Sequence, residues 1–294
     1  METVAFASAA EFAEVAFPYL ERHEAEHNLV LGLTARVASG GRGGRAEGSA
    51  PPRFWAVQDG DETVGAALVT PPHDLALSRC RPGAAAALAA FLHASDIALP
   101  GVTGPVRPAD ELAAAWVAAT SARPVLMRRE RIYELRSVTP PAGVSGTSRT
   151  AGRDELSVLT AWLEAFAACH GDPTEASTAA NELIANGHAL LWLDPEPDSV
   201  AVWSRTTRSG ASIGPVYTPP EKRGRGYGSA VTAALSAQLL AGGREFCCLY
   251  TDLGNSTSNR IYQRIGYRAV ADVNHYRFAM EARDQDVAPG SATA

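Results

Sequence analysis

One stretch of the chain decides the fold: Val216-Tyr217-Thr218-Pro219-Pro220-Glu221-Lys222-Arg223-Gly224-Arg225-Gly226-Tyr227-Gly228-Ser229-Ala230. Its spaced glycines carry no side chains, so consecutive backbone N–H groups can converge on an anion. The Ala- and Leu-rich run 229–240 has no helix breaker and predicts a helix, whose first turn adds unpaired N–H groups and a positive dipole end. Two arginines and the only lysine of the chain add charge. The stretch therefore predicts a phosphate-binding turn between a strand and a helix.

A glycine-rich turn also occurs in flexible loops and in two kinds of nucleotide site. A dinucleotide-binding turn places its first glycine directly after a strand, with an acidic residue about 20 positions later. Here residues 219–223 intervene, and the chain lacks a repeating βαβ pattern. A Walker A loop ends in Gly-Lys-Ser/Thr, whereas Gly228 is followed by Ser229 and Ala230. Both nucleotide sites are disfavoured, and a flexible loop remains the alternative to a phosphate turn.

A second segment follows at a fitting distance downstream. Residues 246–251 form an apolar run that predicts a strand. Asn255 or Ser256 can then cap a helix, and Gly266 suits the left-handed position that ends it. Tyr262 lies one helical turn before that end, where its phenol can reach a ligand held between the two strands.

Together the two segments resemble the GNAT superfamily of acetyl-CoA-dependent N-acyltransferases, over residues from about 150 to 280. The spacing Arg223-x-x-Gly226-x-Gly228 is similar to the diphosphate loop of that family, and Asn255 with Tyr262 is similar to its second cofactor motif. The resemblance implies that Tyr262 protonates the departing thiolate. It also implies a coenzyme A site that comprises Val216, Tyr217 and Thr218 on the strand, Arg223, Gly224, Arg225, Gly226, Tyr227, Gly228 and Ser229 at the turn, and Asn255, Ser258, Asn259 and Tyr262 on the second helix.

The rest of the second half fits the element order of this family. Apolar spacing predicts helices over 154–168 and 174–185, a hairpin of strands 189–193 and 200–205, a strand over 211–217, and closing strands over 268–270 and 275–280. The first half repeats a similar order, with a helix over 9–30, a hairpin over 54–69, helices over 84–94 and 109–119, and a strand over 125–135. The expected fold class is therefore α+β, with a mostly antiparallel mixed sheet flanked by helices in each half.

A length of 294 residues suits two such domains. At the position of the phosphate turn, the first half has Arg79-Cys80-Arg81-Pro82-Gly83, which lacks spaced glycines and contains a proline that removes one donor. The glycine-rich loop 40–45 has no flanking strand or helix and is expected to be a solvated linker. We expect a GNAT-like domain without a cofactor loop over 1–137, a linker over 138–150, a catalytic GNAT domain over 151–282 and a disordered tail over 283–294.

Composition limits the partners of the protein. A formal charge of −6 and a pI near 5.7 argue against a nucleic-acid surface. The chain start lacks a signal-peptide pattern, and no apolar run approaches the ~20 residues of a membrane span, so we expect a soluble, cytoplasmic protein that binds no membrane. No cysteine or histidine spacing indicates a metal, and His23 with His27 fits a solvated helix face. The oligomeric state stays open between monomer and homodimer.

The chemistry of acyl transfer requires a neutral amine, a polarised thioester and a protonated leaving group. A backbone N–H near Val216 can polarise the thioester carbonyl if the strand splays at Pro215. Many family members place a glutamate base on this strand, but Ser212-Ile213-Gly214-Pro215 has no carboxylate. Glu182 and His188 flank the helix that lines the acceptor side in this family, and they are our candidates for a base acting through water.

The missing carboxylate favours a weakly basic acceptor. At pH 7, deprotonation of a lysine-type amine of pKa ~10.4 costs about 4 to 5 kcal/mol, whereas an α-amino group of pKa ~8 costs about 1 to 1.5 kcal/mol. We therefore expect an N-acetyltransferase that uses acetyl-CoA, without a metal, on a primary amine of a small molecule or peptide. The alternative is a non-catalytic protein that binds or senses acyl-CoA.

Overall fold

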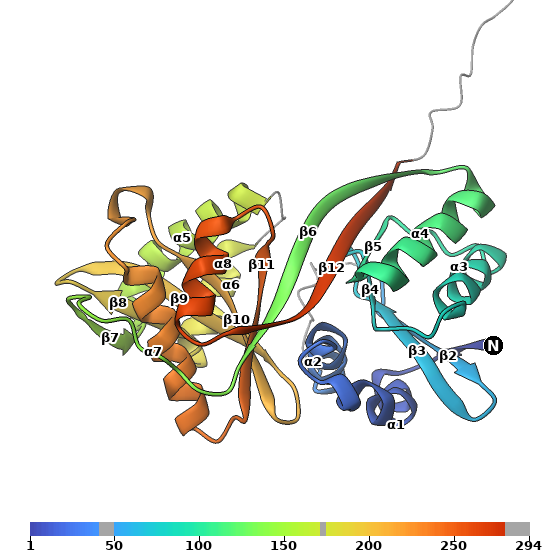
Figure 1. Ribbon diagram of the computed structural model, residues 1–294, viewed down its shortest axis with the longest axis horizontal. Coiled ribbons are helices and arrows are strands. Elements are labelled where there is room, and N and C mark those ends of the chain that lie inside the picture. The colour runs from blue at the N-terminus through green and yellow to red at the C-terminus, as the bar shows by residue number, and fades with distance from the viewer. Residues whose placement is uncertain (41–49, 171–174, 280–294) are drawn as a thin grey trace, which may run out of the picture.

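The computed structural model describes residues 1–40, 50–170 and 175–279, in which one twelve-stranded mixed sheet is flanked by α-helices (Figure 1). The strands are β1 (Glu2–Phe6), β2 (Arg53–Asp59), β3 (Glu62–Val69), β4 (Leu75–Leu77), β5 (Gly101–Pro105), β6 (Arg123–Leu135), β7 (Thr147–Thr150), β8 (Ala189–Leu193), β9 (Pro197–Thr206), β10 (Gly210–Tyr217), β11 (Phe246–Asp252) and β12 (Arg268–Ala279). The helices are α1 (Ala9–Leu20), α2 (Asn28–Ala38), α3 (Ala84–Ala94), α4 (Val106–Thr120), α5 (Leu156–His170), α6 (Ala176–Ala185), α7 (Tyr227–Ala241) and α8 (Ser256–Arg264). The predicted tail 283–294 and residues 41–45 of the glycine-rich loop 40–45 lie outside the described residues.

The two halves of the chain repeat one order of elements. The first half runs β1-α1-α2-β2-β3-β4-α3-β5-α4-β6, and the second runs β7-α5-α6-β8-β9-β10-α7-β11-α8-β12. In each half, one parallel pair flanks a helix, β4 with β5 around α3 and β10 with β11 around α7. The other strand pairs are antiparallel. The predicted α+β class, with a mostly antiparallel mixed sheet flanked by helices, is confirmed.

Two long strands join the halves. The strand order at the centre of the sheet is β5-β12-β6-β11, so β12 pairs with β5 of the first half, and β6 pairs with β11 of the second (Figure 1). The predicted separate strands 268–270 and 275–280 are in fact the single strand β12, apart from Met280, which lies outside the described residues. Irregularities at Ala269/Ala271 and His275/Tyr276 let β12 continue along β6 without a break. The strands of both halves therefore form one continuous sheet. The boundaries of the two predicted domains, 1–137 and 151–282, stay predictions.

The helices of the second half cover opposite faces of the sheet. On one face, α7 and α8 bury apolar side chains against β6 and β11, including Val231, Ile265 and Leu249. On the other face, α5 and α6 pack on β8 and β9 around Leu159 and Leu191. Helix α2 of the first half also packs against β9. Ligands that reach between β10 and β11 would thus meet α8 on one side and the α5, α6 and α2 group on the other.

The predicted helix 9–30 is two helices, because the chain turns between them. Helix α1 ends at Leu20, one 3₁₀ turn follows over Glu21–His23, and α2 begins at Asn28. His27 fixes the turn, since its Nδ1 lies 2.8 Å from the Leu20 carbonyl oxygen and its Nε2 accepts the Arg79 N–H at 3.2 Å. His27 is only 1% exposed, so the predicted solvated helix face is wrong for this residue. The neutral tautomer with a proton on Nδ1 satisfies both bonds.

Protonation of His27 is expected to destabilise the protein in acid. Burial lowers the pKa of His27 to about 4, whereas in the unfolded chain it lies near 6.5. Between these values the unfolded state binds more protons than the folded state, so the free energy of unfolding falls as the pH drops. We expect a loss of about 2 kcal/mol between pH 7.5 and pH 5, measured by urea titration.

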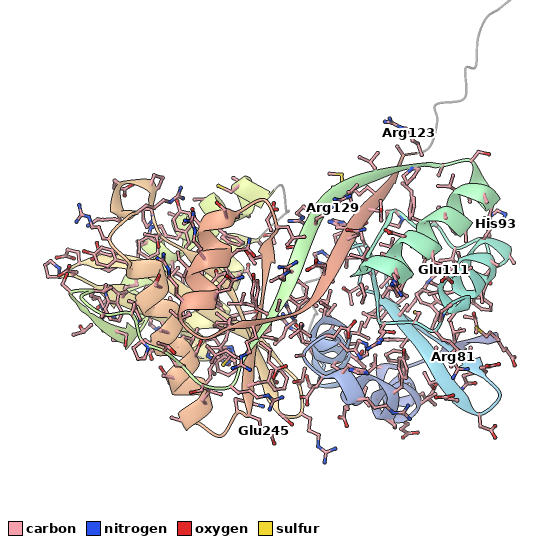
Figure 2. The ribbon with its side chains drawn as sticks, viewed as in Figure 1. Arg81, His93, Glu111, Arg123, Arg129 and Glu245 are labelled. Carbon is pink, nitrogen blue, oxygen red and sulfur yellow. The ribbon has the colours of Figure 1, made fainter. Side chains whose placement is uncertain are left out.

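The variant His27→Gln should lose most of this pH dependence, because glutamine does not titrate. The matched control is His93→Gln, which changes an exposed histidine (Figure 2) and should behave as the wild type. Equal pH dependence in His27→Gln and the wild type would show that other groups cause the acid sensitivity.

Candidate active site

The glycine-rich turn lies between β10 and α7. Gly224 and Gly226 have φ values of +80° and +88°, in the left-handed region that only glycine adopts readily. Gly226 is the N-cap of α7, and no side chain caps that end. The N–H groups of the first turn of α7 have no partner inside the helix. The turn therefore combines free backbone donors with a positive helix end, as a phosphate site requires.

The three cations of the turn have different partners. Lys222 forms an ion pair with the fully buried Asp198, with 2.6 Å between Nζ and Oδ1. The Nε of Arg223 donates to the Thr218 carbonyl at 3.0 Å. Arg225 is exposed and makes no hydrogen bond or ion pair with any other residue of the described ranges. Lys222 and Arg223 thus shape the turn, while Arg225 is available to an anion.

The second predicted motif forms α8 and its cap. The Oδ1 of Asn255 accepts the N–H of Ser258 at 3.0 Å, so Asn255 rather than Ser256 is the cap. The Nδ2 of Asn259 donates to the Asp252 and Asn255 carbonyls at 2.8 Å each. These bonds fix α8 against the end of β11. The contacts of Asn255, Ser258 and Asn259 with coenzyme A stay predictions.

Tyr262 lies on the buried face of α8. Its side chain is 9% exposed, and its ring packs between those of Tyr133 and Tyr267, with centroids 6.5 and 5.9 Å away. Val216 of β10 packs against the same cluster. Burial raises the pKa of Tyr262 to about 12, so the phenol is protonated at neutral pH.

The strands β10 and β11 separate before Pro215, as the sequence predicts. β10 pairs with β11 only over Gly210, Ala211 and Ser212, although both strands continue beyond that point. The pairing of β10 with β9 is irregular between Ser212 and Val216. The backbone from Ile213 to Tyr217 therefore has no strand partner on its β11 side.

A cavity of about 590 Å³ opens on the opposite face of the sheet, with Pro215 in its wall. The two candidate bases, Glu182 and His188, both line it, and α2 of the first half supplies Arg36. Glu182 forms an ion pair with Arg36 at 3.4 Å. The ring of His188 lies on that of Trp203, with 3.8 Å between the centroids. Burial, and to a smaller extent the charge of Arg36, lowers the pKa of His188, so its ring is neutral at pH 7.

The cavity is also lined by Arg36 and Arg205, which are not among the predicted site residues. Arg205 is the one charged residue of the predicted strand 200–205, and this is the signal that the sequence offers. Arg36 gives no such signal, because only tertiary packing brings α2 against β9.

The corresponding turn of the first half, Arg79 to Gly83 before α3, is already occupied by protein groups. The N–H of Ala86 in the first turn of α3 donates to Oε1 of Glu111 at 3.0 Å. Arg81 binds Asp59 at 2.7 Å and Glu62 at 2.5 Å; Figure 2 labels Arg81 and Glu111. A carboxylate of the chain itself thus bonds to the helix end that would otherwise attract a phosphate. That the first half lacks a cofactor loop stays a prediction.

Within the described residues, no group of three or more His, Cys, Asp and Glu side chains is placed to hold a metal ion. In residues 1–40, 50–170 and 175–279, no helix combines the length and apolar character needed to cross a membrane.

The sequence is similar to that of known acetyltransferases. Residues 193–278 match the family model described as FR47-like protein. The chain is 29% identical over 258 residues to a mycothiol acetyltransferase of Thermobispora bispora. The alignment covers 79% of this chain and 86% of that protein. A mycothiol acetyltransferase of Actinosynnema mirum is 32% identical over 175 residues, covering 55% of this chain and 58% of that protein.

Solved structures with the same fold span nearly the whole chain. An acetyltransferase of the GNAT family from Colwellia psychrerythraea has a TM-score of 0.58 at 12% identity and covers 95% of this chain and 100% of its own. A GCN5-related N-acetyltransferase from Sphaerobacter thermophilus has a TM-score of 0.57 at 17% identity, covering 95% and 98%. A tandem GNAT protein from the clavulanic acid biosynthesis pathway has a TM-score of 0.51 at 17% identity, covering 96% and 99%. This chain therefore shares its fold with GNAT acetyltransferases, matches the FR47-like model over residues 193–278 and is similar in sequence to proteins named as acetyltransferases.

Proposed function

We propose that the second half of the chain transfers an acetyl group from acetyl-CoA to a weakly basic primary amine, which attacks the thioester directly. The observation that carries this proposal is the splay between β10 and β11. The buried phenol of Tyr262 lies on one face of the sheet at this gap, and the cavity that contains His188 lies on the other face. If the thioester of acetyl-CoA lies between β10 and β11, Tyr262 can approach its sulfur from one face, and the acceptor amine can approach its carbonyl carbon from the other.

Coenzyme A fits the residues present at the turn. A Cβ on Gly226 would lie 2.8 Å from Cγ2 of Val144, so only glycine leaves this space open. Residues 223–229 would hold the diphosphate through backbone N–H groups and Arg225. The backbone at Val216 and Thr218, which does not pair with β11, would hold the pantetheine arm. When bound, acetyl-CoA supplies the activated acyl group.

Tyr262 would give its proton to the departing sulfur. A phenol with a pKa of about 12 is a weak acid, but burial raises the basicity of a nearby thiolate in the same way. The buried thiols of Cys247 and Cys248 on β11 illustrate this, since burial raises the pKa of each to about 12. Proton transfer between groups of similar pKa has little free-energy cost, so Tyr262 is suited to this role.

His188 is the better of the two candidate bases. Its ring is neutral at pH 7 and can accept a proton from the amine through water. Glu182 is already engaged by the guanidinium of Arg36. A base with a depressed pKa can deprotonate only a weakly basic amine efficiently, so an α-amino group is favoured over a lysine-type amine.

Release of free thiol from acetyl-CoA with a panel of amines tests the proposed acceptor class. The panel should contain α-amino compounds, lysine-type amines and mycothiol-type amines, because two relatives are named mycothiol acetyltransferase. We expect α-amino acceptors of pKa ~8 to react at least tenfold faster at pH 7 than lysine-type amines. A preference for the lysine-type amines would contradict the assignment of the acceptor.

Calorimetry with acetyl-CoA should give one binding site per chain. Of the two corresponding turns, the one before α7 has no side-chain cap, whereas Glu111 bonds to the N-terminal end of α3. Two equivalent sites would contradict our interpretation of the first half.

A further inference from the structure

Arg205 carries an unpaired charge at the wall of the acceptor cavity. Its Nη2 donates to Oγ of Ser212 at 3.2 Å, but its Nε is buried and has no hydrogen-bond partner. No carboxylate of the described residues forms an ion pair with its guanidinium. Gly32 of α2 makes room for this side chain, because a Cβ there would lie 3.0 Å from Cβ of Arg205.

This arrangement is unfavourable in the protein alone. A buried donor without a partner is unfavourable, because it has lost its hydrogen bonds to water and gained none in the protein. The other arginine of the cavity, Arg36, has its counter-charge in Glu182, and His188 is neutral at pH 7. Among the described lining residues, one positive charge therefore lacks an anion.

We infer that the amine accepted by this enzyme also carries a carboxylate, which Arg205 binds. This inference rests on the proposed acetyl transfer, since the cavity then holds the acceptor. One unpaired guanidinium balances a single negative charge, so a carboxylate matches the site better than a phosphate dianion. The guanidinium of Arg205 at the cavity wall would pair with the carboxylate, while the Ser212 hydroxyl holds Nη2 in place.

The strand register sets the length of the acceptor. Arg205 lies opposite Ser212, and Val216, where the thioester is expected, lies further along the same strand. A strand rises about 3.3 Å per residue, so these positions are about 13 Å apart, and the reach of the arginine shortens the gap to roughly 10 Å. An extended peptide spans about 3.5 Å per residue. The amine and the carboxylate should thus be separated as in a tripeptide, and a free α-amino acid is too short.

Oligoglycines of one to four residues and their C-terminal amides are suitable probes. All of these compounds have an α-amino group, and each oligoglycine differs from its own amide only in the C-terminal carboxylate. We expect kcat/KM of the wild type for triglycine to exceed that for triglycine amide by at least tenfold, the range for hydrogen bonds to charged groups, with smaller ratios for glycine and its amide. In Arg205→Gln the triglycine ratio should fall to near one. The matched control, Arg208→Gln, changes an arginine on the same hairpin that is 76% exposed, and it should keep the wild-type ratio.

Thermal unfolding separates this role from a structural one. Removal of an unpaired buried donor should leave the melting temperature of Arg205→Gln unchanged or raised, whereas loss of a structural arginine would lower it. Absence of any carboxylate preference in the wild type, or its survival in Arg205→Gln, would overturn the inference. Calorimetry with triglycine on protein saturated with coenzyme A tests the subsite without turnover. Binding that depends on Arg205, without thiol release from acetyl-CoA, would support the subsite and contradict acetyl transfer.

Discussion

The variant Tyr262→Phe is expected to lose turnover by about 10² to 10⁴, while its dissociation constant for acetyl-CoA changes little. The substitution removes one hydroxyl and keeps the ring that packs against Tyr133 and Tyr267. The proton of Tyr262 matters only when the thiolate leaves, so its loss affects the transition state rather than binding. The measurement is kcat beside the dissociation constant in the same variant.

Tyr267→Phe is the matched control for this prediction. Tyr267 is buried in the same cluster, and its hydroxyl bonds to Oγ of Ser236 at 2.9 Å. Its loss should lower stability by about 1 kcal/mol and leave kcat near the wild-type value. A loss confined to cofactor affinity would reassign Tyr262 to the binding pocket. Unchanged kcat and affinity in Tyr262→Phe would leave protonation of the thiolate to solvent.

The variant Gly226→Val is expected to weaken acetyl-CoA binding at least tenfold, or ~1.4 kcal/mol. Valine is strained at a φ of +88°, and its Cβ would lie 2.8 Å from Val144. The resulting shift would move the backbone donors of the turn away from the diphosphate. Calorimetry on variants shown to be folded by circular dichroism measures the change.

Gly243→Val separates the effect of strain from the effect on the anion site. Gly243 follows the other end of α7 with a φ of +94°, and a Cβ there would meet no atom within 4 Å. This control should lose stability to backbone strain but keep its affinity for acetyl-CoA. Wild-type affinity in folded Gly226→Val would exclude the turn as the phosphate site.

Elements with a local signal could be predicted from the sequence. The uninterrupted Ala- and Leu-rich run predicts α7, and the Asn255 cap with Gly266 brackets α8 to within a residue or two. β4 and β7 gave no such signal, because β4 has three residues and β7 is a short, exposed and polar edge strand. Two hydrophobic segments separated by polar residues gave β12 the appearance of two strands, although pairing with β6 makes it one.

The glycine-rich turn is easier to predict from the sequence than the cavity lined by Glu182 and His188. A phosphate turn depends on glycine spacing within one segment, which the sequence displays directly. The acceptor cavity combines α2 with α6 and β9, and Arg36 meets Glu182 across 146 positions of sequence. Neither the ion pair nor the unpaired state of Arg205 follows from local pattern. Both depend on the packing of the two halves.

The most direct test of acetyl transfer compares thiol released from acetyl-CoA with acetylated amine formed in the same reaction. We predict one acetylated amine for each thiol, at a rate that depends on the amine and falls with Tyr262→Phe and Gly226→Val. Tight binding of acetyl-CoA at one site without amine-dependent thiol release from any acceptor would contradict this account, and would indicate a protein that binds acyl-CoA without catalysis.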